Sequence, residues 1–287
     1  MYPEFLSLDR DFTEYSKSKY VIIPVPYDGT STYGKGADKG PSALIEASDQ
    51  LEYYDVETGL EACFMGIHVD RRPFGFAPDA SGVRKMAEEV EERTASVIRD
   101  RKIPVVIGGE HSVSIGAVFA AAGEYVNLTV LQIDAHSDMR DSYMGSRYNH
   151  ACVMARIMEK ASVLQAGIRS TAKEELVRID RGRIWFDHEI HDSSDWIARL
   201  TEKINGPVYI TFDLDGLDPA VMSATGTPQP GGLSWRETTS LLKAVFATGN
   251  VVGWDIVELC PDGTRTAPFT AAKLLYKMIN YHTLYSK

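Results

Sequence analysis

Three short segments of the chain carry acidic and imidazole side chains directly after apolar runs. They read VVIGGEHSVSIG, with His111, then LQIDAHSDMRD, with Asp134, His136 and Asp138, and YITFDLDGLDP, with Asp213, Asp215 and Asp218. Carboxylates at the edge of a buried core are costly when they lack partners. Several of them together repel one another unless they are protonated or bridged by cations. A cluster of divalent metal ions resolves that conflict, so the three segments together predict a metal centre.

The spacing within these segments suggests how the ligands converge. In an extended chain, residues i, i+2 and i+4 point to one side. Asp134, His136 and Asp138 therefore converge if their strand continues through them, and Asp213 and Asp215 have the same spacing. Oxygen donors with one imidazole per ion favour manganese over zinc. Two such ions about 3.5–4 Å apart can clamp and acidify one bridging water.

Each segment has a simpler interpretation when it is taken alone. DAHSD could be a turn with side-chain caps. The Asp-Gly and Asp-Pro pairs of DLDGLDP are typical of turns, and a histidine after Gly-Gly and before a helix is more often a capping or packing residue. Their joint occurrence at three strand ends of one sheet favours the metal centre.

Short apolar runs alternate with helical patterns along nearly the whole chain. The predicted strands are 21–27, 63–69, 103–108, 128–134, 162–168, 183–187, 207–213 and 251–258. The predicted helices are 41–50, 81–101, 112–122, 150–160, 172–179, 194–204, 234–247 and 268–284. This alternation predicts one α/β domain over residues 1–287, with a parallel sheet buried on both faces. Ligands of such sheets collect at the carboxyl ends of the strands, where the three segments lie.

Composition excludes several classes of function. The net charge of −10 argues against a nucleic-acid partner, which requires a basic surface. The three cysteines are scattered without CxxC spacing, which indicates a reducing compartment. Neither a secretory-type N-terminus nor an apolar run of ~20 residues is evident, so a cytoplasmic protein without a membrane partner is expected.

In these segments the sequence resembles the ureohydrolase family, which includes arginase and agmatinase, and it is most similar to prokaryotic and archaeal agmatinases. The resemblance rests on GGEHSVSIG, DAHSDMRD, TFDLDGLDPAVMSATGTPQPGGLSWRE, VVGWDIVELCP and the start GKGADKGPSAL. It implies a three-layer αβα fold around an eight-stranded parallel sheet, two Mn²⁺ ions and a homo-oligomer, trimeric or hexameric. By motif position it assigns one ion to His111, Asp134, Asp138 and Asp213, and the other to Asp134, His136, Asp213 and Asp215.

The resemblance also implies roles in an amidinohydrolase reaction, in which a metal-bridging hydroxide attacks a guanidinium carbon. Asp138 would bind that hydroxide and pass its proton on, and Glu258 would hold the guanidinium. His150 resembles the family's proton-shuttling histidine, and Thr227 resembles a residue that lines the active site. From the residues alone, His150 could equally belong to the first turn of a helix capped by Asn149, and Glu258 could be an ordinary strand-end glutamate.

Two departures from arginases concern the substrate. Where arginases bind the α-amino acid end with Asn and Asp, this chain has Arg140 and Ala172. Both departures favour agmatine, hydrolysed to putrescine and urea as in polyamine biosynthesis. Arg140 leaves other substrates open, because it opposes a cationic tail unless an acid neutralises it, and it could pair with a carboxylate. The alternatives are a guanidino-acid or aminopropylagmatine ureohydrolase, a formimidoylglutamase, a catalytically degenerate metal-binding member of the family, and an unrelated two-metal phosphoesterase.

Overall fold

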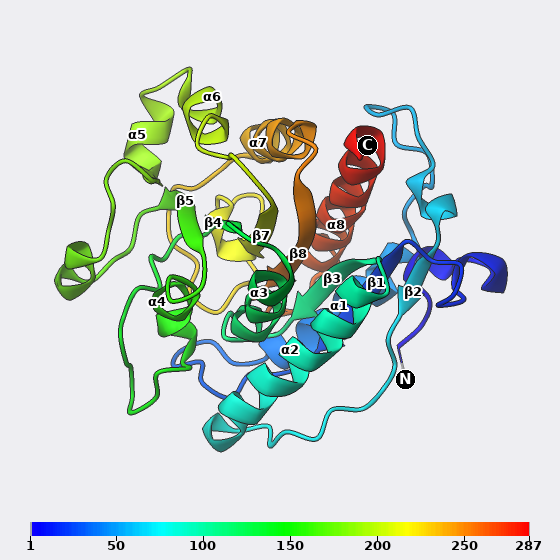
Figure 1. The fold of residues 1–287 in the computed structure, drawn as a ribbon, viewed down its shortest axis with the longest axis horizontal. Helices are drawn as coiled ribbons and strands as arrows, with labels where there is room; N and C mark the ends of the chain where they lie inside the picture. The colour runs from blue at the N-terminus through cyan, green and yellow to red at the C-terminus, as the bar shows by residue number, and fades with distance from the viewer. Residues whose placement is uncertain (1, 287) are drawn as a thin grey trace.

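A single eight-stranded sheet runs through the centre of the computed structural model, which describes residues 2–286 (Figure 1). Its strand order is β2-β1-β3-β8-β7-β4-β5-β6, and every neighbouring pair is parallel. The strands are β1 Tyr20–Val25, β2 Ile67–Val69, β3 Ile103–Gly108, β4 Thr129–Ile133, β5 Ser162–Ile168, β6 Ile184–Phe186, β7 Val208–Asp213 and β8 Val251–Val257. The eight predicted strands and their parallel arrangement are confirmed.

One predicted strand is shorter than expected. Only Ile67–Val69 of the segment 63–69 is extended, because Ala62–Met65 form a 3₁₀ helix. Gly66, with φ of 81°, turns the chain between the two. A left-handed backbone of this kind is readily adopted by glycine. The apolar run therefore supplies a helical turn and a short edge strand.

The helices agree with the sequence pattern except at the short ones. They are α1 Gly40–Ser48, α2 Val83–Arg99, α3 Val113–Glu124, α4 Val153–Ile157, α5 Asp187–His191, α6 Trp196–Thr201, α7 Trp235–Ala247 and α8 Thr266–Tyr285. The predicted helix 150–160 is a 3₁₀ turn followed by α4, and the predicted helix 172–179 is the 3₁₀ helix Lys173–Val177. The sequence did not predict α5, because five residues are too few to show a helical period.

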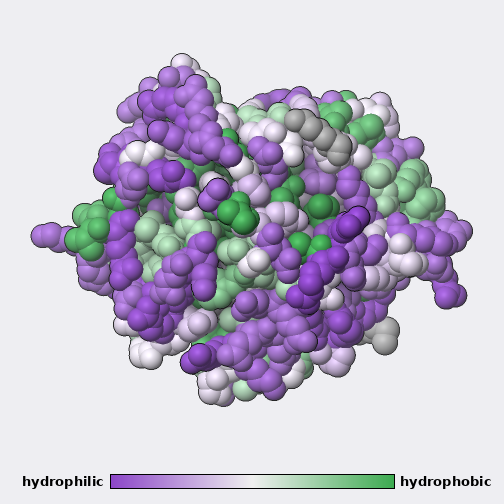
Figure 2. All heavy atoms as spheres, viewed as in Figure 1, coloured by the Kyte–Doolittle hydropathy of each residue, from purple (hydrophilic) through white to green (hydrophobic). Residues whose placement is uncertain are grey.

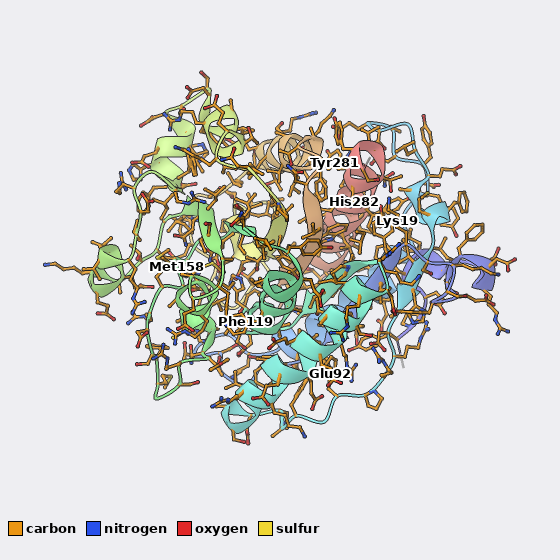
Figure 3. The ribbon with its side chains drawn as sticks, viewed as in Figure 1. Lys19, Glu92, Phe119, Met158, Tyr281 and His282 are labelled. Carbon is orange, nitrogen blue, oxygen red and sulfur yellow. The ribbon has the colours of Figure 1, made fainter. Side chains whose placement is uncertain are left out.

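Two layers of helices cover the two faces of the sheet. Along β1, Tyr20 and Ile22 belong to the buried cluster that includes residues of α1, α7 and α8, whereas Val21 and Ile23 belong to the cluster that includes residues of α2, α3 and α4. This alternation follows from the two-residue period of a strand. Figure 3 labels His282 on α8, whose Nδ1 lies 2.9 Å from the Tyr20 hydroxyl in the first of these layers. The three-layer αβα architecture is confirmed.

The face of the molecule drawn in Figure 2 is mostly polar. Figure 2 shows hydrophilic residues over most of one face, with hydrophobic residues in small separate groups. Such dispersed apolar residues are ordinary on a globular surface. Within residues 2–286, no helix is both long and apolar enough to cross a membrane.

The strand order brings four carboxyl ends together at the middle of the sheet. The chain leaves β3 and builds β4, β5 and β6 further along, and it then returns to insert β7 and β8 between β3 and β4. Strands β3, β8, β7 and β4 are therefore consecutive neighbours. The three predicted ligand segments follow three of these strands, so the topology itself places their side chains at one edge.

Helix α3 packs so closely on α2 that it requires a glycine. A Cβ at Gly116 would lie 2.2 Å from the Ala87 carbonyl oxygen, whereas a Cβ at Gly123 on the same helix meets nothing within 4 Å. We expect Gly116→Ala to lower the free energy of unfolding by about 1–3 kcal/mol through overpacking. Gly123→Ala is the matched control and should raise it by up to about 1 kcal/mol through helix propensity. Denaturant unfolding of both variants measures the difference, and equal stabilities would contradict the close approach.

Candidate metal centre

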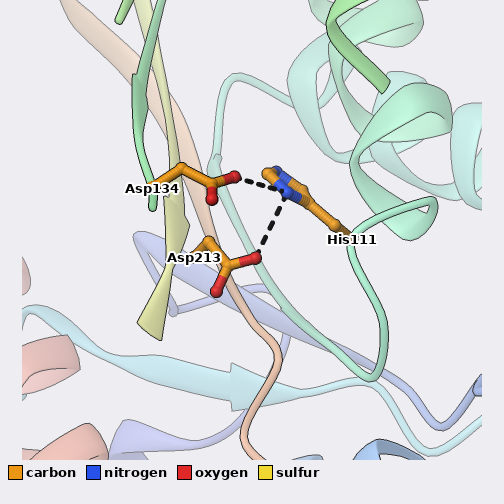
Figure 4. A group of neighbouring side chains, drawn as sticks. All are labelled: His111, Asp134 and Asp213. Carbon is orange, nitrogen blue, oxygen red and sulfur yellow. Dashed lines mark ion pairs between the residues drawn. The ribbon is translucent and has the colours of Figure 1, made fainter. Parts of the chain in front are cut away.

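The imidazole of His111 lies among three carboxylates. Its Nδ1 is 3.0 Å from an oxygen of Asp134, 3.0 Å from one of Asp138 and 3.3 Å from one of Asp213. Figure 4 shows His111, Asp134 and Asp213 pointing toward one another from three different chain segments. All four side chains are buried. The structure thus brings together the four residues that the resemblance assigned to the first ion.

A second group adjoins the first and shares Asp134 with it. The Nδ1 of His136 lies 2.9 Å from Asp215 Oδ2 and 3.6 Å from Asp134 Oδ1. The other oxygen of Asp134, Oδ2, faces His111. Ligand atoms within each of the sets His111–Asp134–Asp213 and Asp134–His136–Asp215 lie within 4.8 Å of one another. A carboxylate with one oxygen in each group has the geometry of a bridging ligand.

Backbone amides hold the carboxylates in orientation. Asp213 Oδ1 accepts a hydrogen bond from the amide of Asp215 at 2.9 Å, and Asp215 Oδ1 accepts one from the amide of Ala135 at 3.0 Å. In each case the second oxygen is the one that faces a histidine. In the carboxylates of Asp213 and Asp215, one oxygen therefore accepts a backbone hydrogen bond that fixes the side chain, and the other oxygen points to the centre of the cluster.

Crowding of the carboxylates perturbs their protonation. Burial, and then the charges of Asp215 and Asp134, raise the pKa of Asp213 well above its ordinary value. Burial and the Asp134 charge raise the pKa of Asp138 to about 6. Burial opposes protonation of His136, but Asp215 and Asp134 together raise the pKa of its imidazole to about 12. These opposed shifts are those of a buried anionic cluster that requires compensating positive charge.

The backbone reaches this geometry by turns, which corrects the expected extended spacing. Strand β4 ends at Ile133, and Asp138 has a left-handed φ of 52°. Asp213 is the last residue of β7, but Asp215 lies in the 3₁₀ helix Leu214–Gly216. A positive φ at a non-glycine residue costs free energy and persists where surrounding contacts impose it. The Asp138 carbonyl accepts such a contact from the Met154 amide at 3.0 Å.

Thr211 and Asp255 support His111 from behind, and sequence reasoning missed both. The Thr211 hydroxyl lies 2.9 Å from His111 Nε2 and donates to Asp255 Oδ1 at 2.8 Å. Because a hydroxyl has a single hydrogen, its oxygen then accepts from Nε2–H. Nδ1 is left as the bare nitrogen, and it is buried without a hydrogen-bond partner in the described structure. The sequence marks Thr211 and Asp255 only as polar residues within two apolar strands.

This donor set fits divalent metal ions. A buried bare imidazole nitrogen aimed at three carboxylate oxygens is what an ion would coordinate. Oxygen donors predominate, and the three cysteines lie outside both groups. Hard oxygen-rich sites of this kind suit manganese or magnesium better than zinc.

Glu258 lies at the rim of the cluster. It directly follows β8 and has a left-handed φ of 66°. Its Oε1 accepts a hydrogen bond from the His111 amide at 2.7 Å, and burial raises its pKa well above the ordinary value. A Cβ on Gly226 would lie 3.7 Å from Glu258 Oε2. Thr227, the next residue, is exposed, so the structure places it beside this rim but not inside the cluster.

His150 lies in a capped turn close to the cluster. It begins the 3₁₀ turn His150–Cys152, and the Asn149 side chain caps that turn by accepting from the Ala151 amide. Its ring is half-buried near the cluster. Burial is the largest cause that lowers its pKa, to about 4. The imidazole is therefore neutral at ordinary pH, whichever role it has.

The two arginines near the cluster are already engaged. Arg140 forms an ion pair with Glu174, and its guanidinium lies over the Tyr143 ring at 4.9 Å. Arg169 donates to the backbone carbonyls of Asp215 at 2.6 Å and of Gln229 at 3.1 Å. An arginine that spans backbone carbonyls is not free to bind phosphate, which argues against the phosphoesterase alternative.

The fold and the cluster together define an αβα hydrolase-type protein with two adjoining His/Asp groups at the carboxyl edge of its sheet. The family model described as the Arginase family matches residues 18–280. The chain belongs to the arginase family and is a ureohydrolase of that family.

Individual relatives cover nearly the whole chain. An N(1)-aminopropylagmatine ureohydrolase of Synechocystis sp. is 40% identical, with 94% of this chain and 90% of the relative covered. An agmatinase of Pyrococcus horikoshii is 34% identical, with 91% and 90% covered. The solved structure of an agmatine ureohydrolase of Thermoplasma volcanium has a TM-score of 0.83 and 32% identity, with 96% and 94% covered. The predicted resemblance to prokaryotic and archaeal agmatinases is confirmed.

The hydroxyl behind His111 yields a test of the metal centre. We expect Thr211→Val to weaken Mn²⁺ binding by about 10–100-fold, because the buried Nε2–H loses its acceptor and the ring its orientation. Thr211→Ser keeps the hydroxyl and should bind nearly as the parent does. Titration of the full chain with Mn²⁺, with free ion followed by electron paramagnetic resonance, measures the affinity. Unchanged binding by the valine variant would contradict this role.

Proposed function

We propose that the chain is a two-manganese ureohydrolase that releases urea from a cationic alkylguanidine of the agmatine type, leaving putrescine when the substrate is agmatine. The observation that carries the proposal is Asp134, which presents one oxygen to each of two His/Asp groups. Two metal ions bound there would supply an acidified water as the nucleophile. The oxygen-rich donors support manganese as their identity.

The chain's own residues then divide the remaining work. The Glu258 carboxylate, at the rim of the cluster, would hold the guanidinium in a charge-assisted hydrogen bond. Asp138, with its raised pKa, would accept the proton of the attacking water. His150 would deliver a proton to the departing amine, which leaves poorly as an anion.

Arg140 bears on the choice of guanidine. Its pairing with Glu174 offsets its positive charge, so a substrate with a cationic tail is tolerated beside it. Tyr143, the ring beneath Arg140, packs edge-on against His150 with centroids 6.3 Å apart, which connects this pair to the proposed active site. A neutralised Arg140 supports agmatine over guanidino acids.

N(1)-aminopropylagmatine is the second candidate substrate. The 40% identical relative carries that name, and the relative named agmatinase is 34% identical. Both compounds share the guanidinium and the butyl spacer, and they differ in the length and charge of the tail. The pairing of Arg140 with Glu174 accommodates either tail.

The reaction is tested by urea release from manganese-loaded protein. We expect turnover of agmatine or aminopropylagmatine, and little or none of arginine or guanidinobutyrate, because Arg140 is already paired with Glu174 and does not offer its charge to a carboxylate tail. Asp138→Ala should reduce kcat by at least about 10²-fold through loss of the proton acceptor. A parallel assay of formamide distinguishes a formimino substrate, which releases formamide, from a guanidine, which releases urea. Absence of urea from every guanidine, in a sample shown to hold two ions per chain, would overturn the proposal.

The ion pair of Arg140 gives a test of specificity. In Glu174→Gln the Arg140 charge is no longer offset, so KM for agmatine should rise by up to about 5-fold, the range for an exposed ion pair. KM for guanidinobutyrate should fall, and kcat for agmatine should change little. Glu189→Gln breaks a comparable exposed pair with Arg181 and serves as control. Equal effects on both substrates would exclude Arg140 from the tail-binding region.

A further inference from the structure

Glu110 is a fully buried carboxylate to which the proposed reaction assigns no role. It precedes His111 in the GGEH segment and has no exposed surface. Its oxygens accept hydrogen bonds from Thr30 N at 2.6 Å, Thr30 Oγ1 at 2.5 Å, Ser112 Oγ at 2.6 Å and Ser31 Oγ at 3.2 Å. An ionised carboxylate only accepts. Four donors around it therefore have their hydrogens committed to it.

The Thr30 hydroxyl transmits this commitment to His150. Its single hydrogen points at Glu110, so its oxygen can only accept from other groups. It accepts from the backbone amide of His150 at 3.0 Å and lies 3.1 Å from Nδ1 of the same ring. The second contact is favourable only when Nδ1 carries the proton. The neutral ring of His150 is then bare at Nε2.

The loops that carry these groups are tied to each other. The amides of Gly109 and Glu110 donate to the carbonyls of Val25 and Tyr27, at 2.9 and 2.8 Å. A Cβ on Gly109 would lie 2.0 Å from the backbone carbonyl oxygen of Tyr27. These contacts fix the distance between the loop after β3, which carries Glu110, and the loop after β1, which carries Thr30.

We propose that Glu110 is a positioning residue, which acts through the Thr30 hydroxyl to hold His150 in the Nδ1–H tautomer with Nε2 as its working nitrogen. This rests on the proposed role of His150 in the ureohydrolase reaction. A proton that arrives at Nε2 converts the ring to imidazolium, and it leaves from the same atom to the departing amine nitrogen. The proton on Nδ1 stays in place throughout, so the ring need not rotate between the two transfers.

Glu110→Gln provides a direct test, because the side-chain amide of the glutamine can fit the surrounding donors in only one orientation. The Thr30 backbone N–H is an obligate donor, so the glutamine oxygen must take the Oε2 position and the NH₂ group the Oε1 position. The NH₂ group then donates to the Thr30 oxygen, and the Thr30 hydrogen is released to His150 Nδ1. We expect the His150 tautomer to invert to Nε2–H.

Nitrogen-15 NMR of the histidine-labelled full chain, loaded with Zn²⁺ as a diamagnetic ion, reports the tautomer. His150→Asn identifies the resonances among the seven histidines. The parent should show a protonated Nδ1, and Glu110→Gln a protonated Nε2. Ser31→Ala is the matched control, since it removes a Glu110 donor that does not contact His150, and it should retain the parent tautomer.

Protonated Nε2 in the parent chain would overturn the proposal without any variant. An unchanged tautomer in a folded Glu110→Gln would also overturn it, since Glu110 would then itself carry a proton.

Kinetics separate this inference from the proposed function. Glu110→Gln should lower kcat for urea release by about 10²-fold or more, with a smaller change in KM. Thr30→Ser should recover most of the kcat that Thr30→Val loses, because only the hydroxyl is required. If the parent releases no urea from any guanidine, the proposed function fails, and the NMR result still decides whether Glu110 sets the tautomer. Equal kcat for Thr30→Ser and Thr30→Val would exclude the relay from the reaction.

Discussion

The structure is organised around buried negative charge at the carboxyl edge of its sheet. Asp134, Asp138 and Asp213 share one buried space with the Nδ1 of His111, and Asp215 lies just beyond them. Carboxylates cannot be desolvated together without compensation. Asp134, Asp213 and Asp215 each accept a hydrogen bond from a backbone amide, and the cluster as a whole requires compensating positive charge. The site geometry follows from that requirement more than from any property of the individual strands.

The sheet topology is what makes such crowding possible. The late insertion of β7 and β8 between β3 and β4 makes β3, β8, β7 and β4 four consecutive strands of the sheet. The segments that follow them reach one another at the same edge, even across the two inserted strands, since His111 after β3 lies 3.0 Å from Asp134 after β4. The strands that hold the ligands are buried on both faces and pair along their length, so they cannot splay apart to relieve the repulsion. A binding edge of this kind is expected where the strand order of an open parallel sheet changes direction.

The sequence predicts the fold and the side chains that the structure gathers into the cluster, because both depend on strong local signals. Nearly continuous apolar runs reveal doubly buried strands, and Asp134, His136 and Asp213 stand out at the ends of such runs. The turned backbone at Asp138 and at Glu258 is not predictable in this way, because contacts from distant segments impose it. A helix as short as α5 also lacks a readable period.

The supporting groups could not be found from sequence for a different reason. Thr211 and Asp255, like Thr30 and Glu110, act as pairs whose members are far apart along the chain, and neither member is unusual alone. In both pairs a buried carboxylate accepts the single hydrogen of a threonine hydroxyl, and the hydroxyl oxygen faces a histidine. A carboxylate in direct contact would also orient the ring, but it would place a further negative charge against a cluster that already has an excess. A neutral hydroxyl between them fixes the tautomer and keeps that charge one group away. The recurrence of this arrangement at two histidines of one site follows from the same constraint that governs the carboxylates themselves.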